Sequence, residues 1–478
     1  MELPREVRYR PYQDWTKEEL KNIENRVNQS PWRCHYHIEA RTGLLNDPNG
    51  FSYFNGQFHL FYQHWPFGPA HGLKEWVHTY STDLVHFTES QTRLLPDSPL
   101  DSHGAYSGSA YPIKDQLFLF YTGNVRDKDW NRQAFQLGAW MSKEGKIQKL
   151  PQALIKQPKD VTDHFRDPQF FCYKEEFYAL IGAQNKEGQG LIKLYKAINN
   201  DVTNWQLLGD LDIGEWQGQY MVECPHLVFI DDKPVLISSP QGLDRSELHY
   251  DNIYPNTYQV FDHFDPKEAR LVGGQPIQNL DFGFETYATQ AFNSPDSRVL
   301  AVSWVGLPDI NYPTDRYDYQ GALSLVKELS LKNGQLYQFP VDNLKKLRQE
   351  AQVFQSLDKS SNTYELVLDI SADQKAQIQL FANQHSGLLL TVDTQKGYME
   401  IDRSKAGQPY AQAFGQQRSC QIPQEHVTLN IYVDKALVEI FVNQGQRVLT
   451  SRVFPDANQT GIKHLVGQVT GHYYEMRY

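Results

Sequence analysis

Residues 46–62 read NDPNGFSYFNGQFHLFY, in which an acidic turn motif precedes a polar turn and a short strand of aromatic and aliphatic residues. The polar turn and its strand recur along the chain at intervals of about 60 residues, and the five copies begin at Asn55, Lys114, Lys174, Asp231 and Pro295. A long repeat with several strands per unit is typical of propeller blades, since each blade is a small sheet that must stack on its neighbours. The repeat therefore predicts an all-β propeller.

Two further acidic motifs occupy the same place in the repeat as Asp47, namely Arg166-Asp167-Pro168 and Glu223-Cys224-Pro225. Ser107 and the stretch 285–287 fill the matching positions of the other two copies. Because equivalent positions of a radial repeat point at one place, we expect the three carboxyl groups to converge on the central axis. Like charges held close together cannot all stay ionised at neutral pH, and such perturbed groups mark functional sites. The spacing therefore predicts an active site at the axis.

A chain of 478 residues is too long for one compact core, so the sequence predicts two domains. Short strands with Gly, Pro, Asn and Asp at their turns fill residues 31–340, the predicted propeller. A short charged segment at 341–350 is the predicted linker. Longer alternating strands such as 364–370 and 427–433 predict that residues 351–478 form a C-terminal β-sandwich.

Residues 1–30 form a predicted N-terminal helical extension. Its helix spans 15–27 and begins with a capping box made by Thr16 and Glu19. We expect the helix to pack on the first blade through an apolar stripe, which consists of Trp15, Leu20, Ile23 and Val27.

The composition limits the classes of binding partner and the cellular compartment that we expect. The net charge of −11 argues against nucleic acid or an anionic membrane as the main partner, and 13% aromatic residues suit stacking against sugar rings. No apolar run approaches the roughly 18 residues that span a bilayer, and the first residues lack the apolar core of a secretion signal. The four cysteines show no CxxC spacing. We therefore expect a cytoplasmic protein that acts on a small molecule.

The surroundings of the three carboxyl groups suggest separate roles. Retaining cleavage of a glycosidic bond needs two carboxyl groups about 5–5.5 Å apart, one as nucleophile and one as acid and then base. Asp47 lies in a turn-rich stretch and suits an ionised nucleophile. The apolar residues 221–222 before Glu223 are expected to raise its pKa, as a proton donor requires. Arg166 is expected to keep Asp167 ionised, so that this carboxylate accepts hydrogen bonds from sugar hydroxyls.

Further motifs extend the pattern over nearly the whole chain, from about residue 31 to the C-terminus. With the acidic motifs, the chain resembles glycoside hydrolase family 32, the β-fructofuranosidases of the invertase group. The additional segments that carry the resemblance are FYQH at 61–64, YSGS at 106–109, SWVG at 303–306, YPTD at 312–315 and VEIFV at 438–442.

The resemblance implies a five-bladed β-propeller followed by a β-sandwich, and hydrolysis of sucrose 6-phosphate or sucrose with retention, without metal or cofactor. It implies Asp47 as nucleophile, Glu223 as general acid and base, and Asp167 as stabiliser of the transition state. The substrate-binding residues that it implies are Leu44, Leu45, Asn46, Gln63, Tyr106, Ser107, Arg166 and, more weakly, Trp304. Two alternatives remain: a fructan hydrolase or fructosyltransferase on the same scaffold, and a sugar-binding propeller without catalysis.

Two histidine positions carry separate interpretations. His71 stands where many relatives carry a tryptophan, so His71 and Lys74 either contact a phosphate on the leaving glucose or belong to a solvated loop. His35 and His37 lie on one face of a strand as a metal pair could. No third ligand group is evident in the sequence, so packing is the expected role of this pair.

Overall fold

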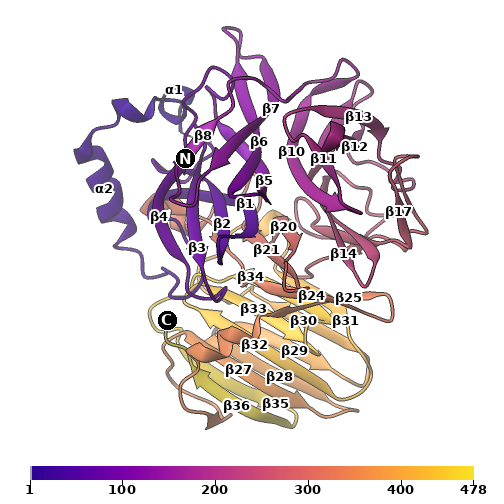
Figure 1. Cartoon of the computed structure of the whole chain (residues 1–478). Helices are drawn as coiled ribbons and strands as arrows, with labels where there is room; N and C mark the ends of the chain where they lie inside the picture. The colour runs from indigo at the N-terminus through magenta and orange to yellow at the C-terminus, as the bar shows by residue number, and fades with distance from the viewer. Residues whose placement is uncertain (1–2) are drawn as a thin grey trace.

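The computed structural model describes residues 3–478, so residues 1 and 2 of the predicted extension lie outside it. The chain is all-β apart from a helical N-terminal segment and short 3-10 turns. Figure 1 shows the strands up to β21 in the upper part of the molecule and most of the strands from β27 on, in orange and yellow, in the lower part, with β24 and β25 where the two parts meet. Within residues 3–478, no helix has the length and apolar character that crossing a bilayer requires.

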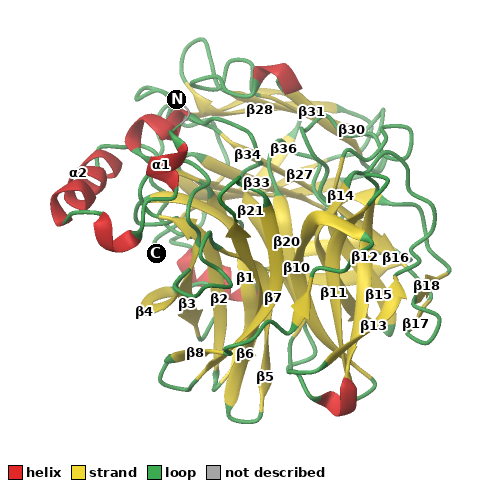
Figure 2. Cartoon of the chain, turned by 90° about the horizontal axis from the view of Figure 1, so that it is seen from above, coloured by secondary structure: helices red, strands yellow, loops and turns green. Residues whose placement is uncertain are grey.

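The N-terminal segment packs on the outside of the first sheet, as predicted. It contains α1 (Arg5–Arg8), η1 (Tyr12–Asp14) and α2 (Lys17–Val27). The predicted capping box is present, because the Thr16 side chain accepts from the Glu19 N–H and the Glu19 carboxylate accepts from the Thr16 N–H. The buried faces of Ile23 and Val27 pack in one cluster with Trp65. Figure 2 shows α2 at the outer edge of the molecule.

Five antiparallel sheets follow one another along the chain between residues 43 and 340. The first consists of β1 (Gly43–Phe54), β2 (Gln57–Trp65), β3 (Glu75–Ser81), β4 (Thr88–Leu94) and, parallel to β1, β22 (Tyr319–Gln320). The second consists of β5 (Ala105–Ile113), β6 (Gln116–Arg126), β7 (Arg132–Met141), β8 (Ile147–Lys149) and β9 (Ile155–Lys156). The third consists of β10 (Val161–Tyr173), β11 (Glu176–Asn185), β12 (Gly190–Ala197) and β13 (Trp205–Asp210).

The fourth sheet consists of β14 (Met221–Ile230), β15 (Lys233–Gln241), β16 (Thr257–Val260) and β19 (Gln278–Asn279). The fifth consists of β20 (Tyr287–Asn293), β21 (Val299–Val305), β23 (Ala322–Leu323), β24 (Lys327–Lys332) and β25 (Gln335–Pro340). A separate hairpin and two short 3-10 turns complete this part: β17 (His263–Asp265), β18 (Arg270–Val272), η2 (Ile198–Asn200) and η3 (Pro313–Tyr317). A further 3-10 turn, η4 (Asp342–Leu347), follows β25. The repeated strand of the sequence is thus the second strand of every sheet.

The first strands of the five sheets, β1, β5, β10, β14 and β20, share one irregularity. Each breaks its pairing register with the second strand, between Leu45 and Pro48, Ala105 and Gly108, Arg166 and Gln169, Glu223 and His226, and Tyr287 and Gln290. In chain order each of these strands lies beside the next, and β20 lies beside β1. A β-bulge re-aims side chains, and bulges occur next to active sites. The acidic motifs coincide with these bulges.

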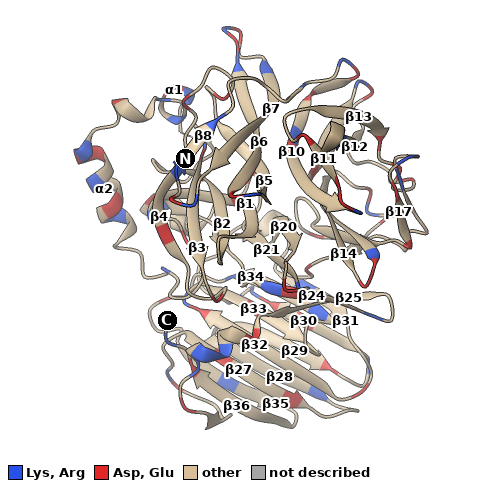
Figure 3. Cartoon of the chain, viewed as in Figure 1, with Lys and Arg blue, Asp and Glu red and all other residues tan. Residues whose placement is uncertain are grey.

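Aromatic and aliphatic side chains fill the space between neighbouring sheets. Phe61 and Trp76 of the first sheet pack with Tyr121 of the second, and Phe118 of the second packs with Phe170 of the third. At about 25 cal/mol per Å² of apolar surface removed from water, these buried aromatic layers are a main source of stability. Figure 3 shows the complementary pattern, with charged residues gathered mostly at turns and strand ends.

The C-terminal part is two antiparallel sheets, as expected for a sandwich. The first contains β26 (Gln352–Val353), β27 (Thr363–Ile370), β32 (Val427–Asp434), β33 (Leu437–Val442), β34 (Arg447–Arg452) and β36 (Val469–Glu475). The second contains β28 (Lys375–Ala382), β29 (Leu388–Asp393), β30 (Tyr398–Asp402), β31 (Gln417–Gln421) and β35 (Gly461–Val466), and η5 (Gln412–Phe414) lies before β31. One core cluster joins the two sheets, for example Leu366 and Leu368 with Ile378 and Leu390.

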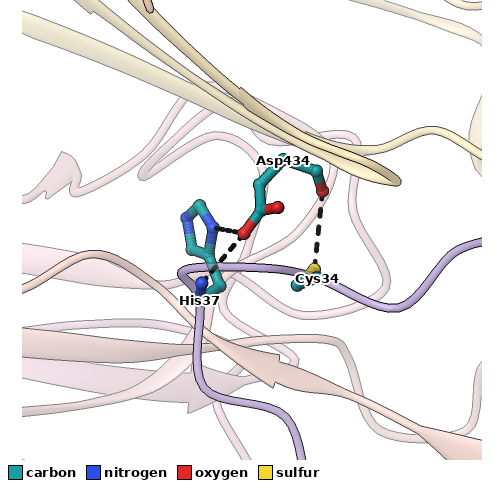
Figure 4. Close-up of side chains that lie close together, drawn as sticks. All are labelled: Cys34, His37 and Asp434. Atoms are coloured by element: carbon teal, nitrogen blue, oxygen red, sulfur yellow. Dashed lines mark hydrogen bonds and ion pairs between the residues drawn. The ribbon is translucent and has the colours of Figure 1, made fainter. Parts of the chain in front are cut away.

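A buried ionic cluster ties the segment before β1 to the C-terminal sheets. Asp434 accepts the backbone N–H groups of His35, Tyr36 and His37 at 2.7, 2.8 and 2.9 Å, and His37 Nδ1 lies 2.9 Å from its Oδ2 (Figure 4). His37 Nε2 lies 3.0 Å from Glu439 Oε1. Both His37 ring nitrogens therefore contact carboxylates. The strand expected around His35 and His37 is absent, because residues 35–37 form a bend. A third ligand-type group that the sequence did not reveal does lie nearby, since ligand atoms of Cys34, His37 and Asp434 lie within 4.8 Å of one another.

Candidate active site

The bulged first strands surround a pocket of about 230 Å³. All three predicted carboxyl groups line it. The other predicted residues that line it are Asn46, Gln63, Tyr106, Ser107, Arg166 and Trp304. Leu44 and Leu45 do not line the pocket, and both are fully buried, because β1 is covered on both of its faces. Sequence reasoning missed Arg132, Gln241 and Pro308, which belong to no acidic motif.

Asp47 is held by neighbours on two strands. Ser107 Oγ donates to Asp47 Oδ2 at 2.5 Å, and Asn46 Nδ2 lies 3.1 Å from Oδ1. Burial raises the pKa of Asp47 above its ordinary 3.8, the Ser107 hydrogen bond opposes this, and the charge of Glu223 adds to it. The carboxylate is thus oriented toward the pocket by two side-chain hydrogen bonds.

Asn46 is itself fixed by a buried lysine. Lys74 Nζ donates to Asn46 Oδ1 at 2.7 Å, and the Asn46 amide donates to Gln63 Oε1. Lys74 is only 2% exposed, and burial lowers its pKa to about 7, although the charge of Asp47 favours the ammonium. Lys74 therefore anchors the wall beside Asp47 and is not part of a solvated loop.

Asp167 lies on the bulge of β10 with a left-handed backbone, φ 67°. Its Oδ2 accepts from the Cys224 N–H at 3.0 Å and lies 3.5 Å from Cys224 Sγ. Burial raises the pKa of Asp167 to about 7; Arg166 opposes the rise, and the charges of Glu223 and Asp47 add to it. The prediction that Arg166 keeps Asp167 ionised is therefore wrong, because the guanidinium hydrogen-bonds a different carboxylate.

Glu223 is the carboxylate that Arg166 binds. Arg166 Nε and Nη2 donate to Glu223 Oε1 at 2.9 and 2.6 Å, and Tyr287 Oη donates to Oε2 at 2.6 Å. Burial alone would raise the pKa of Glu223, but Arg166 and Tyr287 outweigh it and lower the pKa below its ordinary value. The expectation that an apolar setting raises the pKa of Glu223 is thus wrong, because charge-assisted hydrogen bonds favour the carboxylate.

His71 lines the pocket with its ring 6.2 Å from, and nearly perpendicular to, the ring of Trp304. Burial lowers its pKa well below the ordinary value, so the imidazole is neutral. A neutral ring can shape the pocket wall and hydrogen-bond a sugar, but it offers no charge to a phosphate.

Two of the pocket carboxyl groups and a buried cysteine beside them have the spacing of a metal site. Ligand atoms of Asp47, Asp167 and Cys224 lie within 4.8 Å of one another. Burial raises the pKa of the Cys224 thiol well above its ordinary value, whereas a metal binds the thiolate. The thiol instead lies near both carboxylates, 3.5 Å from Asp167 Oδ2 and 3.8 Å from Asp47 Oδ2.

Comparison with known proteins places this pocket in a family. The family models "Glycosyl hydrolases family 32 N-terminal domain" and "Glycosyl hydrolases family 32 C terminal" match residues 37–340 and 332–473. The chain belongs to glycoside hydrolase family 32. It is 61% identical to a sucrose-6-phosphate hydrolase of Streptococcus mutans over 100% of both chains.

Two solved structures of family 32 members extend the comparison. A sucrose-6-phosphate hydrolase from Lactobacillus gasseri superposes with a TM-score of 0.97 at 42% identity and covers 100% of this chain and 99% of its own. A variant of a Bombyx mori GH32 β-fructofuranosidase in complex with sucrose has a TM-score of 0.84 at 27% identity, with coverage of 98% and 99%. The chain is therefore similar to family 32 hydrolases over its whole length.

Proposed function

We propose that this family 32 glycoside hydrolase cleaves sucrose 6-phosphate, and also sucrose, into fructose and glucose 6-phosphate or glucose. The observation that carries the proposal is the meeting of three carboxyl groups from three sheets in one pocket. The similarity to the Streptococcus mutans and Lactobacillus gasseri sucrose-6-phosphate hydrolases supports this substrate.

The proposed reaction is a double displacement with retention. The Asp47 carboxylate attacks the anomeric C2 of the fructosyl unit, and the C2–O bond breaks as Glu223 gives its proton to the leaving glucosyl oxygen. Glu223 then takes a proton from a water molecule, whose oxygen attacks C2 and releases Asp47. Asp167 accepts hydrogen bonds from fructose hydroxyls and stabilises the positive charge that develops on the ring.

The reaction needs a proton on Glu223, whereas Arg166 and Tyr287 favour its carboxylate form. Three interacting carboxyl groups titrate together, so their protons belong to the group rather than to one residue. Fructose hydroxyls that take over the hydrogen bonds of Arg166 would leave Glu223 buried beside Asp47, and burial then raises its pKa. We propose that the proton shared with Asp167 moves to Glu223 in this way.

We also propose that the five sheets are the blades of one propeller, because their first strands lie beside one another from β1 to β20 and β20 lies beside β1. The proposed domains are the extension 1–30, the propeller 31–340, the linker 341–350 and the sandwich 351–478. We place the enzyme in the cytoplasm with a small-molecule substrate, since a phosphorylated sugar does not cross a membrane unaided. The two family models match residues 37–340 and 332–473, which supports the division into a propeller and a sandwich.

Substitution of the two reacting carboxylates tests the proposal. Asp47→Asn and Glu223→Gln should each lower kcat on sucrose 6-phosphate by about 10³-fold or more, because each removes a group that acts in the transition state. Exposed Glu268→Gln, on the β17–β18 hairpin, is the control and should retain activity. Near-normal turnover by either pocket variant, with folding verified by circular dichroism, would refute the assigned roles.

A further inference from the structure

Two arginines oppose each other on neighbouring strands, and one of them, Arg132, lines the active-site pocket. Arg126 is the last residue of β6, Arg132 is the first of β7, and the two are direct cross-strand partners. Directly opposed residues of an antiparallel pair have Cβ atoms about 4.5–5.5 Å apart, and like charges in such a pair repel. An anion between the two guanidinium groups would remove this repulsion.

The pair has little compensation from the protein. Within residues 3–478, Asp163 is the one carboxylate at ion-pair distance, 3.2 Å from Arg132 Nε, and its side chain is 42% exposed. Arg126 forms no ion pair there, and its buried Nε has no hydrogen-bond partner. Its Nη1 donates to the Trp130 carbonyl at 3.1 Å. Several guanidinium N–H donors of Arg126 and Arg132 thus remain available for a ligand with several oxygens, such as a phosphate.

The location fits the leaving group rather than the fructosyl unit. Arg132 lines the same pocket as Glu223 and lies near Arg166; burial lowers the pKa of Arg132, and the charge of Arg166 lowers it further. Arg132 and Arg166 also share a neighbour, because both approach His164 Nδ1, at 3.4 and 2.9 Å. Glu223 protonates the leaving oxygen, so the arginine on its side of the pocket meets the departing sugar. Asn46 and Lys74 hold the wall beside Asp47 instead.

The N-terminal segment completes this rim. The ring of Tyr9 lies 5.0 Å from that of Trp130, nearly perpendicular to it, and Arg126 lies 5.6 Å from the same indole. Arg8 Nη1 donates to the His71 carbonyl at 3.1 Å, which joins the segment to the pocket wall. An aromatic wall beside the arginines restricts water around an anion there and strengthens its attraction to the guanidinium groups.

We propose that Arg126 and Arg132 form the subsite for the phosphate of the leaving glucose 6-phosphate, an inference that rests on the proposed function. The pair thereby sets the preference for the phosphorylated disaccharide. The neutral His71 and the lysine bound to Asn46 do not serve this purpose.

The ratio of kcat/KM for sucrose 6-phosphate to kcat/KM for sucrose tests the subsite. Arg126→Gln and Arg132→Gln should each lower this ratio about 10-fold to 100-fold, as expected for loss of a charged hydrogen bond, and the double variant should lower it further. Arg126→Lys keeps the charge but loses the planar guanidinium with its several N–H donors, so its ratio should lie between those of the wild type and Arg126→Gln. The matched control is Arg270→Gln, an arginine on the β17–β18 hairpin, which should keep the wild-type ratio.

Calorimetry that compares the binding of glucose 6-phosphate with that of glucose distinguishes failure of the subsite from failure of the proposed function. Under the proposal the wild type prefers glucose 6-phosphate and the glutamine variants lose that preference. An unchanged rate ratio and unchanged preference, or a parallel fall for both substrates in a folded variant, would overturn the subsite. A wild type that cleaves neither disaccharide would instead refute the proposed function, while the calorimetry would still test the two arginines.

Discussion

Folding stability should fall as the pH rises from 6.5 to 9, because His37 is buried as a cation between two carboxylates. Its Nδ1 lies 2.9 Å from Asp434 Oδ2 and its Nε2 lies 3.0 Å from Glu439 Oε1. Burial would lower its pKa, but these hydrogen bonds outweigh burial and raise it from 6.5 to about 9. This rise in the pKa of His37 means that the fold favours the charged over the neutral imidazole by about 3 kcal/mol of free energy.

The direction of this pH dependence follows from the linkage between protonation and folding. The raised pKa favours the protonated folded state, so the contribution is complete below pH 6.5 and disappears as the pH rises through about 9. Substitution His37→Gln removes the cation and leaves two buried carboxylates without it, which costs about 3–5 kcal/mol. The variant should therefore be much less stable than the wild type at pH 6.5, and the difference should shrink toward pH 9.

Urea unfolding of the wild type and His37→Gln at pH 6.5 and 9, followed by fluorescence, measures this difference. The control is His249→Gln, whose imidazole is 82% exposed and should leave the unfolding free energy nearly unchanged at both pH values. If the difference between the wild type and His37→Gln were the same at the two pH values, the charged state of His37 would be wrong.

Three substitutions in the pocket test its electrostatics through the pH dependence of kcat/KM. Arg166→Gln removes the charge and the two hydrogen bonds that lower the pKa of Glu223, so the alkaline limb should move to higher pH while kcat/KM falls about 100-fold. Tyr287→Phe removes a single hydrogen bond from Glu223 and should move the alkaline limb the same way by less; a move to lower pH in either variant would contradict the assignment. Lys74→Met removes a charge that lowers the pKa of Asp47, so the acidic limb should move to higher pH, and an unmoved limb would contradict this coupling.

The repeat in the sequence predicts more of the architecture than of the site chemistry. Periodic turns locate the second strand of each of the five sheets, and the acidic motifs coincide with register breaks that the backbone shows at Asp47, Asp167 and Glu223. The capping box of Thr16 also forms as predicted. These features depend on local patterns, which one stretch of sequence contains in full.

Partners from distant segments could not be predicted in the same way. The pKa directions depend on Arg166 binding Glu223, which is 57 positions away and on another sheet. His37 meets Asp434 across 397 positions. Leu44 precedes the acidic motif but is buried, since neighbouring residues of a strand point to opposite faces and both faces of β1 are covered.

The central claim, that Asp47 attacks the fructosyl carbon while Glu223 handles the proton, is tested most directly by trapping the intermediate. Glu223→Gln, incubated with β-fructofuranosyl fluoride, whose fluoride leaves without a proton from an acid, and quenched in acid, should gain the mass of one fructosyl group on the peptide that contains Asp47, because the second step then lacks its base. The double variant Asp47→Asn, Glu223→Gln should gain none. A fructosyl group found on any other residue, or one that still forms in the double variant, would contradict the account.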